Sequence, residues 1–170
     1  MARKSSKNTQ PRECMPCTAC CDGWVSMNIN GADVFPGSPC PHSAGNSCKI
    51  YAERPVDPCI NFNCGWVVKN SVLPDWFRPD LAKVIVIPDM FIWQGLPVDM
   101  ATPVGKKIPG RALNWLKVYA EQQGRPLVWF EHTNVLDGNK HTPLMLAHGP
   151  AAFQQDMNQL LENGESLWPT

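Results

Sequence analysis

The stretch Cys14-Met15-Pro16-Cys17-Thr18-Ala19-Cys20-Cys21 decides how the first third of this chain is held together. Its first three cysteines stand three residues apart, and a fourth follows directly. Two residues between cysteines let the chain turn back, so that both sulfurs reach one metal while backbone amides point at them. Neighbouring side chains diverge, so we expect Cys20 and Cys21 not to bind the same ion.

The other cysteines of the 170-residue chain follow within a short distance, and no cysteine occurs after Cys64. A closed zinc site or an iron-sulfur cluster takes four thiolates. Eight cysteines therefore allow two four-cysteine sites, or one site with four cysteines left for other work. The candidate metal ligands are Cys14, Cys17, Cys20, Cys21, Cys40, Cys48, Cys59 and Cys64.

The order of these motifs resembles the CxxCxxCC, or YkgJ-like, family of cysteine-cluster proteins that chelate zinc or iron. The resemblance rests on the opening C-x2-C-x2-C-C and on Cys48-Lys-Ile-Tyr-Ala-Glu-Arg-Pro, which leads to Cys59. It covers the region from Cys14 to Cys64 and leaves the carboxy-terminal hundred residues out. It implies that all eight cysteines are metal ligands. Within it, Tyr51, Arg54 and Pro55 correspond to the family's recurring tyrosine and arginine-proline step.

Three alternatives compete with this interpretation of the cysteines. An even number of cysteines in a compact segment also fits a disulfide framework. A thioredoxin-like redox motif at Cys14 and Cys17 requires a preceding strand and a following helix, which the sequence does not indicate. His42 stands two residues after Cys40 and is able to replace one thiolate in a zinc site of three cysteines and one histidine.

Composition excludes several classes of function. Lysine plus arginine (15) balances aspartate plus glutamate (15), so no net field draws the chain onto nucleic acid, and we expect no nucleic-acid partner. The most apolar stretch, from Leu81 to Val98, is interrupted by charged residues and prolines, so we expect no membrane insertion. The amino-terminal residues lack an apolar run of signal-peptide length, which predicts a cytoplasmic protein with reduced thiols.

The chain divides into three regions by composition. We expect residues 1–13 to form a flexible amino-terminal tail and residues 14–65 to form a cysteine-rich metal-binding module. We expect residues 66–170 to form an α+β region that packs with the module as one unit. In the module, the segments 28–41 and 55–58 contain many turn formers and few periodic apolar residues, which predicts irregular loops pinned by metal.

The α+β region contains four recognisable elements. Lys83–Ile87, bounded by Pro88, and Pro126–His132 read as strands of one sheet. Arg111–Gln123 reads as an amphipathic helix that stops at Gly124, and 150–162 as a final helix. A turn is expected at Asp137-Gly138. The predicted fold class is α+β: a small irregular metal-bound module packed on a small mixed sheet with two or more helices.

The sequence thus predicts a metal-binding protein that holds an iron-sulfur cluster or zinc, with redox or modification chemistry as a role for the metal. One alternative is a zinc-stapled, non-catalytic module that binds a protein partner. Another is a cluster-dependent protein-modifying enzyme, because a lysine methylase acting on flagellin is similar to the family in its cysteine motif. The sequence leaves open whether the chain is an enzyme.

Overall fold

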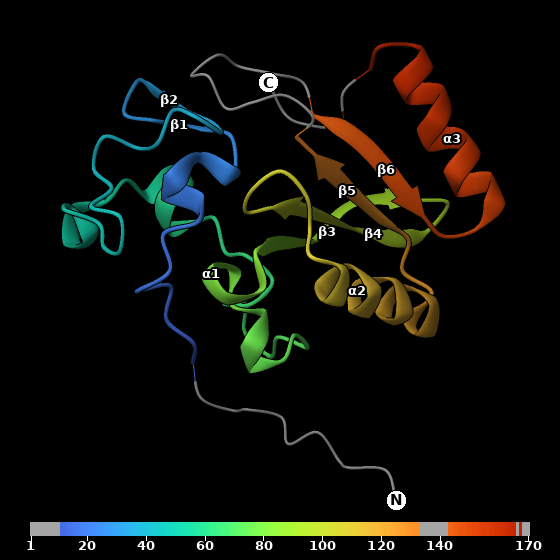
Figure 1. Cartoon of the computed structure of the whole chain (residues 1–170), viewed down its shortest axis with the longest axis horizontal. Coiled ribbons are helices and arrows are strands. Elements are labelled where there is room, and N and C mark those ends of the chain that lie inside the picture. Colours follow the sequence, from blue (N-terminus) through green and yellow to red (C-terminus); the bar gives the residue numbers. More distant parts are fainter. Residues whose placement is uncertain (1–10, 133–142, 166, 168–170) are drawn as a thin grey trace, which may run out of the picture.

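The computed structural model describes residues 11–132, 143–165 and 167, and it has an α+β fold (Figure 1). The turn predicted at Asp137-Gly138 lies outside the described residues. The first half contains short elements: η1 (Cys20–Trp24), β1 (Met27–Ile29), β2 (Ala32–Val34), η2 (Tyr51–Glu53), η3 (Val56–Ile60), η4 (Asp75–Phe77) and α1 (Pro79–Ala82). The second half contains β3 (Val84–Trp93), β4 (Leu96–Pro103), α2 (Gly110–Gln123), β5 (Leu127–Glu131), β6 (Leu144–His148) and α3 (Ala151–Glu162).

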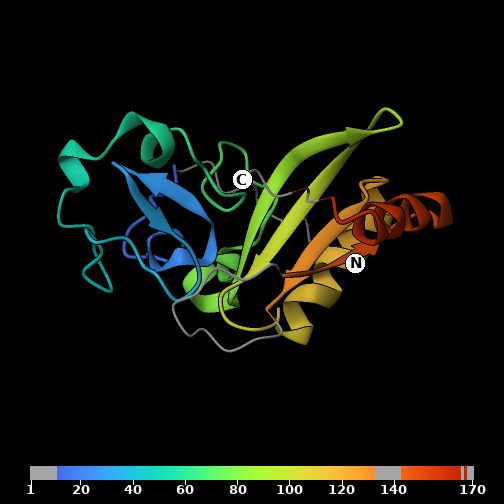
Figure 2. The same ribbon diagram turned by 90° about the horizontal axis from the view of Figure 1, so that it is seen from above.

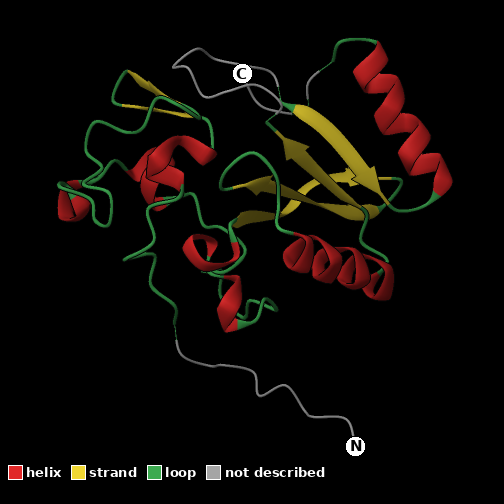
Figure 3. Ribbon diagram, viewed as in Figure 1, coloured by secondary structure: helices red, strands yellow, loops and turns green. Residues whose placement is uncertain are grey.

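The main sheet is mixed and has the strand order β3-β4-β5-β6 (Figure 3). β3 pairs antiparallel with β4, β4 pairs parallel with β5, and β5 pairs antiparallel with β6. α2 forms the crossover between the two parallel strands, and it ends at Gly124, whose φ of 61° allows the left-handed cap. Both predicted strands therefore belong to one sheet, as expected, but β4 lies between them.

Alternating side chains of the sheet give it two buried faces. Leu127 and Trp129 of β5 pack against α2, whereas Val128 and Phe130 pack against Phe153 of α3. The period of two along the strand produces this division. One helix therefore covers each face, and the two helices lie on opposite sides of the sheet (Figure 1).

The cysteine-rich half, residues 14–64, lies beside β3 (Figure 2). It packs on the same face of the main sheet as α3, on the part that α3 does not cover. Ile85 of β3 is fully buried in a cluster that contains Cys17 and Cys64. Opposite Ile85 in the ladder, the Thr102 hydroxyl donates to the carbonyl oxygen of Trp24 at 3.2 Å. Gly65 donates its N–H to Val86 at 2.6 Å, which attaches the end of the cysteine segment to the edge strand.

Two parts of the fold differ from the sequence prediction. The strand predicted to end before Pro88 runs on to Trp93, because a register shift between Ile87 and Phe91 absorbs the proline. The segment 28–41, expected to be irregular, contains the β1–β2 hairpin with Asn30-Gly31 at its turn. Among the described residues, none of the helices is long and apolar enough to span a membrane.

Candidate metal centre

The eight cysteines are all free thiols, and six of them gather in two apolar clusters. We call Cys17, Cys20 and Cys64 the sheet-side cluster, because they pack with Val25 and with Ile85 of β3. We call Cys21, Cys40 and Cys59 the hairpin-side cluster, because they pack with Ile29 and Val34 of the β1–β2 hairpin. The adjacent residues Cys20 and Cys21 thus belong to different clusters, which agrees with the expected divergence of neighbouring side chains.

Short loops hold the two remaining cysteines next to these clusters. Cys17 donates its N–H to the carbonyl of Cys14 at 3.0 Å, which closes the first C-x2-C turn. Cys48 forms an antiparallel bridge with Ser43, and Ser43 in turn donates its N–H to the carbonyl of Cys40 at 2.9 Å. The loops therefore bring Cys14 towards the sheet-side cluster and Cys48 towards the hairpin-side cluster.

Backbone amides point at two sulfurs of the sheet-side cluster. Burial raises the pKa of Cys17, and the backbone N–H groups of Ala19 and Asp80 act in the opposite direction as donors to its sulfur. Burial likewise raises the pKa of Cys64, while backbone N–H groups of Val67 and Trp66 lower it. In iron-sulfur and zinc sites, backbone amides commonly donate hydrogen bonds to the thiolate ligands.

Burial and neighbouring cysteines favour the neutral form of several of these thiols. Burial of its sulfur, followed by the charges of Cys17 and Cys64, raises the pKa of Cys14 to about 11. Burial also raises the pKa of Cys21 to about 12, with the charges of Cys40 and Cys48 next in importance. Because each thiolate disfavours its neighbours, an ionised set is stable only with a compensating cation.

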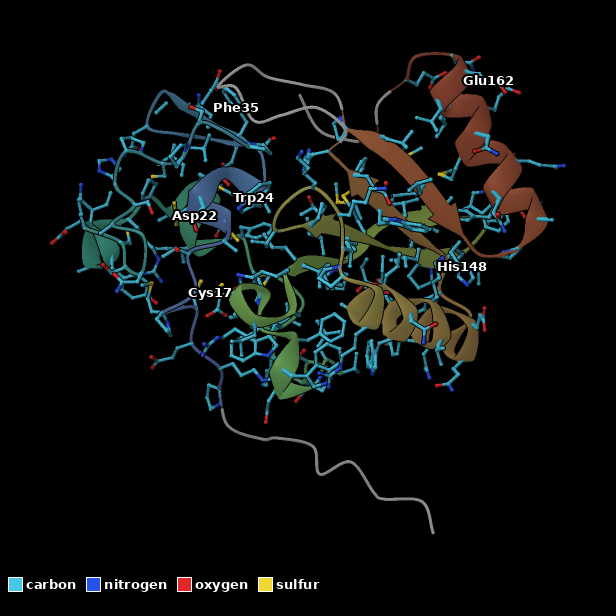
Figure 4. The ribbon with its side chains drawn as sticks, in the orientation of Figure 1. Cys17, Asp22, Trp24, Phe35, His148 and Glu162 are labelled. Atoms are coloured by element: carbon cyan, nitrogen blue, oxygen red, sulfur yellow. The ribbon has the colours of Figure 1, made fainter. Side chains whose placement is uncertain are left out.

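Asp22 joins the first cysteine loop to the loop that carries Cys40 and Cys48. Its carboxylate lies 3.0 Å from the Thr18 hydroxyl and accepts a 3.3 Å hydrogen bond from the Ser43 hydroxyl. The Thr18 hydroxyl also lies 2.9 Å from the carbonyl oxygen of Gly45, and its single proton serves one acceptor at a time. Figure 4 shows Cys17 and Asp22 in this half of the molecule, with Trp24 on the side towards the sheet.

Arg54 packs against the chain between Cys48 and Cys59. Arg54 stacks over the ring of Tyr51 at 3.8 Å and donates to the Tyr51 carbonyl at 2.6 Å, and its charge favours ionisation of Cys14 and Cys59 against burial. Pro55 directly precedes η3, which carries Cys59. The three residues of the family-like tyrosine and arginine-proline step therefore form one local unit beside both clusters.

Arg12, which the sequence places in the flexible tail, is tied to the chain that follows Cys64. It donates to the carbonyl oxygens of Trp66 at 3.0 Å and of Leu73 at 2.9 Å, and it pairs with Asp75 at 2.8 Å. Its guanidinium also lies 4.7 Å from the centre of the Trp66 ring. These contacts connect the chain on either side of the sheet-side cluster, and nothing in the sequence except the charge of Arg12 indicates them.

An open pocket of about 340 Å³ adjoins the first cysteine loop. Its polar lining includes Thr18, Asp22 and Asn46 from the cysteine-rich half, and Asp80 and Lys83 from α1 and the residue after it. Asp80 is paired with Arg78 at 2.6 Å. The pocket reaches the lower size range of small-ligand sites and carries charges of both signs.

In the described part of the chain, no three cysteine, histidine or acidic side chains are already placed so that they could hold a metal ion. His42, the alternative zinc ligand, is half-buried, and its carbonyl accepts the N–H of Lys49. The donor set itself suits zinc or an iron-sulfur cluster, because it consists of thiols with amide donors at two of them. Binding would have to draw the sulfurs together, as expected where a site forms with its metal.

The chain matches no protein-family model, no curated protein and no solved structure. The relationship to the CxxCxxCC family therefore stays a prediction, and it rests on the cysteine spacing and on the segment from Cys48 to Cys59.

Proposed function

We propose that this chain is a metal-binding protein that holds zinc or an iron-sulfur cluster through its eight cysteines. One observation carries the proposal: eight free thiols lie in or beside two apolar clusters within one segment, and they are not joined in disulfides. Burial raises the pKa of six of them, so these six thiols ionise less readily than exposed cysteines do. A divalent metal or cluster supplies the positive charge that stabilises thiolates.

The metal would hold the cysteine-rich half in shape. This half contains two three-residue strands and single turns, which bury too little apolar surface to fold strongly by themselves. Structural zinc in small domains contributes about 10–16 kcal/mol of apparent binding free energy. A zinc-stapled module that presents its surface to a protein partner is the non-catalytic form of this proposal.

A second candidate is a cluster-dependent protein-modifying enzyme, and the pocket beside Thr18 and Asp22 is what favours it. A ligand in that pocket would lie next to the loop between Cys17 and Cys20. An iron-sulfur cluster there would supply an electron, while Lys83 and Asp80 would bind charged groups of the ligand. This candidate requires iron, whereas the interaction module requires only zinc.

Purification without oxygen tests the proposal and separates its two forms. We expect zinc without visible colour for a staple, or iron with acid-labile sulfide and broad absorption near roughly 400 nm for a cluster. The matched control is the same protein treated with a chelator and a thiol reductant and then desalted. Protein that contains neither metal, and that takes up neither zinc nor iron with sulfide afterwards, would show that the cysteines have another role.

A further inference from the structure

The two cysteine clusters indicate how the metal ligands are divided. Sheet-side and hairpin-side sulfurs rest on different apolar supports, Ile85 of the main sheet for one and Ile29 and Val34 of the hairpin for the other. A four-thiolate site must gather its sulfurs around one ion or cluster. Sulfurs that already share a support have the shortest path to a common metal.

The chain order of the ligands fits this division without crossing loops. Cys20 and Cys21 are neighbours and point into different clusters, so the C-x2-C-x2-C-C motif contributes to both. The backbone of Cys40 then attaches to Cys21 through a 2.7 Å hydrogen bond from its N–H to the Cys21 carbonyl. Cys64 returns at the end of the segment to the cluster that contains Cys17.

We propose, on the basis of the metal-binding function above, that the chain holds two separate four-thiolate sites. The sheet-side site consists of Cys14, Cys17, Cys20 and Cys64, and the hairpin-side site consists of Cys21, Cys40, Cys48 and Cys59.

The loops place the two remaining cysteines in these sets. Cys17 donates its N–H to the carbonyl of Cys14 at 3.0 Å. Ser43 forms an antiparallel bridge with Cys48 and donates its N–H to the carbonyl of Cys40 at 2.9 Å.

The division of the ligands is tested with four double variants. They combine the same four serine substitutions in different pairs. Cys14→Ser with Cys64→Ser removes two ligands from the sheet-side site, and Cys48→Ser with Cys59→Ser removes two from the hairpin-side site. The matched controls combine Cys14→Ser with Cys59→Ser, and Cys48→Ser with Cys64→Ser, so that each site loses one ligand. Zinc, iron and acid-labile sulfide are measured per chain after anaerobic purification, and Co²⁺ is titrated into the metal-free proteins as a spectroscopic probe of thiolate binding.

We expect each same-site variant to keep about half of the wild-type metal, with one intact four-thiolate site visible in the Co²⁺ spectrum. We expect the re-paired controls to retain less metal than either same-site variant, with weaker thiolate-to-cobalt absorption at both sites. Equal metal in the same-site variants and the controls overturns the division, and so does complete loss of metal from both same-site variants. The single variant Cys14→Ser checks for misfolding, because it should leave the hairpin-side metal in place. Wild-type protein that contains no metal and takes none up afterwards refutes the metal-binding function itself, whereas the two contrary outcomes above refute only the division.

Discussion

Gly23 is the residue on which the geometry of the first cysteine loop depends most directly. It lies in η1, two residues after Cys21, with a φ of 97° that side-chain-bearing residues rarely adopt. A Cβ atom at this position would lie 2.1 Å from the carbonyl oxygen of Phe35, which is backbone and has no side-chain freedom to move aside. The close approach joins η1 to the chain just after β2, and so it places the C-x2-C-x2-C-C loop against the hairpin.

We expect Gly23→Ala to destabilise the cysteine-rich half more than the same change at a glycine with open space. Gly31 is the matched control, because its φ of 86° is similar and no atom lies within 4 Å of the added Cβ. Left-handed strain should cost each variant about 1–2 kcal/mol, and the clash should cost Gly23→Ala a further 1–3 kcal/mol, about the penalty for overpacking. Urea unfolding of both variants, followed by tryptophan fluorescence, measures the difference. Equal losses of unfolding free energy would mean that the backbone near Phe35 yields at little cost.

At the scale of elements, a charged network fixes β4 between its neighbours. Asp99 of β4 is buried and accepts 2.5 and 3.0 Å hydrogen bonds from Arg125, which lies between α2 and β5. Arg125 also pairs with Asp89, and the Asp89 N–H donates to Asp99 at 3.1 Å in the irregular part of β3. Hydrogen bonds and charges from both aspartates raise the pKa of Arg125, so the guanidinium stays charged. One buried carboxylate thus holds the β3 bulge and the start of β5 in register.

We expect Asp99→Ala to lower the free energy of unfolding by about 3 kcal/mol, because it leaves a partly buried guanidinium without its main partner. Lys107→Ala is the control: it breaks the 3.2 Å ion pair of an exposed lysine with Glu131, where such pairs contribute about 0–1 kcal/mol. Both values come from urea unfolding followed by circular dichroism, with metal content held equal. If Asp99→Ala lowers the free energy of unfolding by less than about 1 kcal/mol, side-chain packing alone holds β4 in register.

The elements that the sequence could predict are those whose signal is local. Helix α2, with apolar residues at helical spacing and Gly124 at its end, begins one residue before its predicted start. β4 was missed because Pro97 and Pro103 argue against a central strand. Both prolines are tolerated, since β5 pairs only with Asp99–Ala101. The hairpin of β1 and β2 was also missed, although Asn30-Gly31 is a typical turn signal.

For the candidate site, the sequence predicts which cysteines are ligands, and this stays a prediction, but it does not predict the contacts of the residues around them. Spacing alone singled out Cys20 and Cys21 as residues that diverge, and the structure places them in different clusters. The contacts of Asp22 with Thr18 and Ser43 join loops that are distant in sequence. Such contacts leave no periodic pattern, so only the folded chain reveals them.

At the scale of the whole molecule, α3 and the cysteine-rich half both pack on one face of the main sheet, and different interactions stabilise them. α3 packs on Val128 and Phe130 with large apolar side chains such as Phe153. The cysteine-rich half packs on Ile85 at the other end of the same face. Because the first covering is an ordinary apolar core and the second is rich in thiols, their stabilities should respond differently to metal.

We therefore expect metal removal to open the cysteine-rich half while the sheet stays folded. If a metal holds the thiolates as proposed, chelation in reducing buffer withdraws it, so limited proteolysis should cut within 14–64 and leave a resistant fragment that contains β3 through α3. Mass spectrometry of the fragments locates the cuts, and adding zinc, or iron with sulfide, back before digestion is the control that should restore resistance. If 14–64 remains as resistant after chelation as before, the apolar contacts around Ile85, Ile29 and Val34 are sufficient to hold this half without metal. If the sheet is digested at the same rate as 14–64, the two halves unfold as one cooperative unit, because the burial of Ile85 is then lost together with the metal.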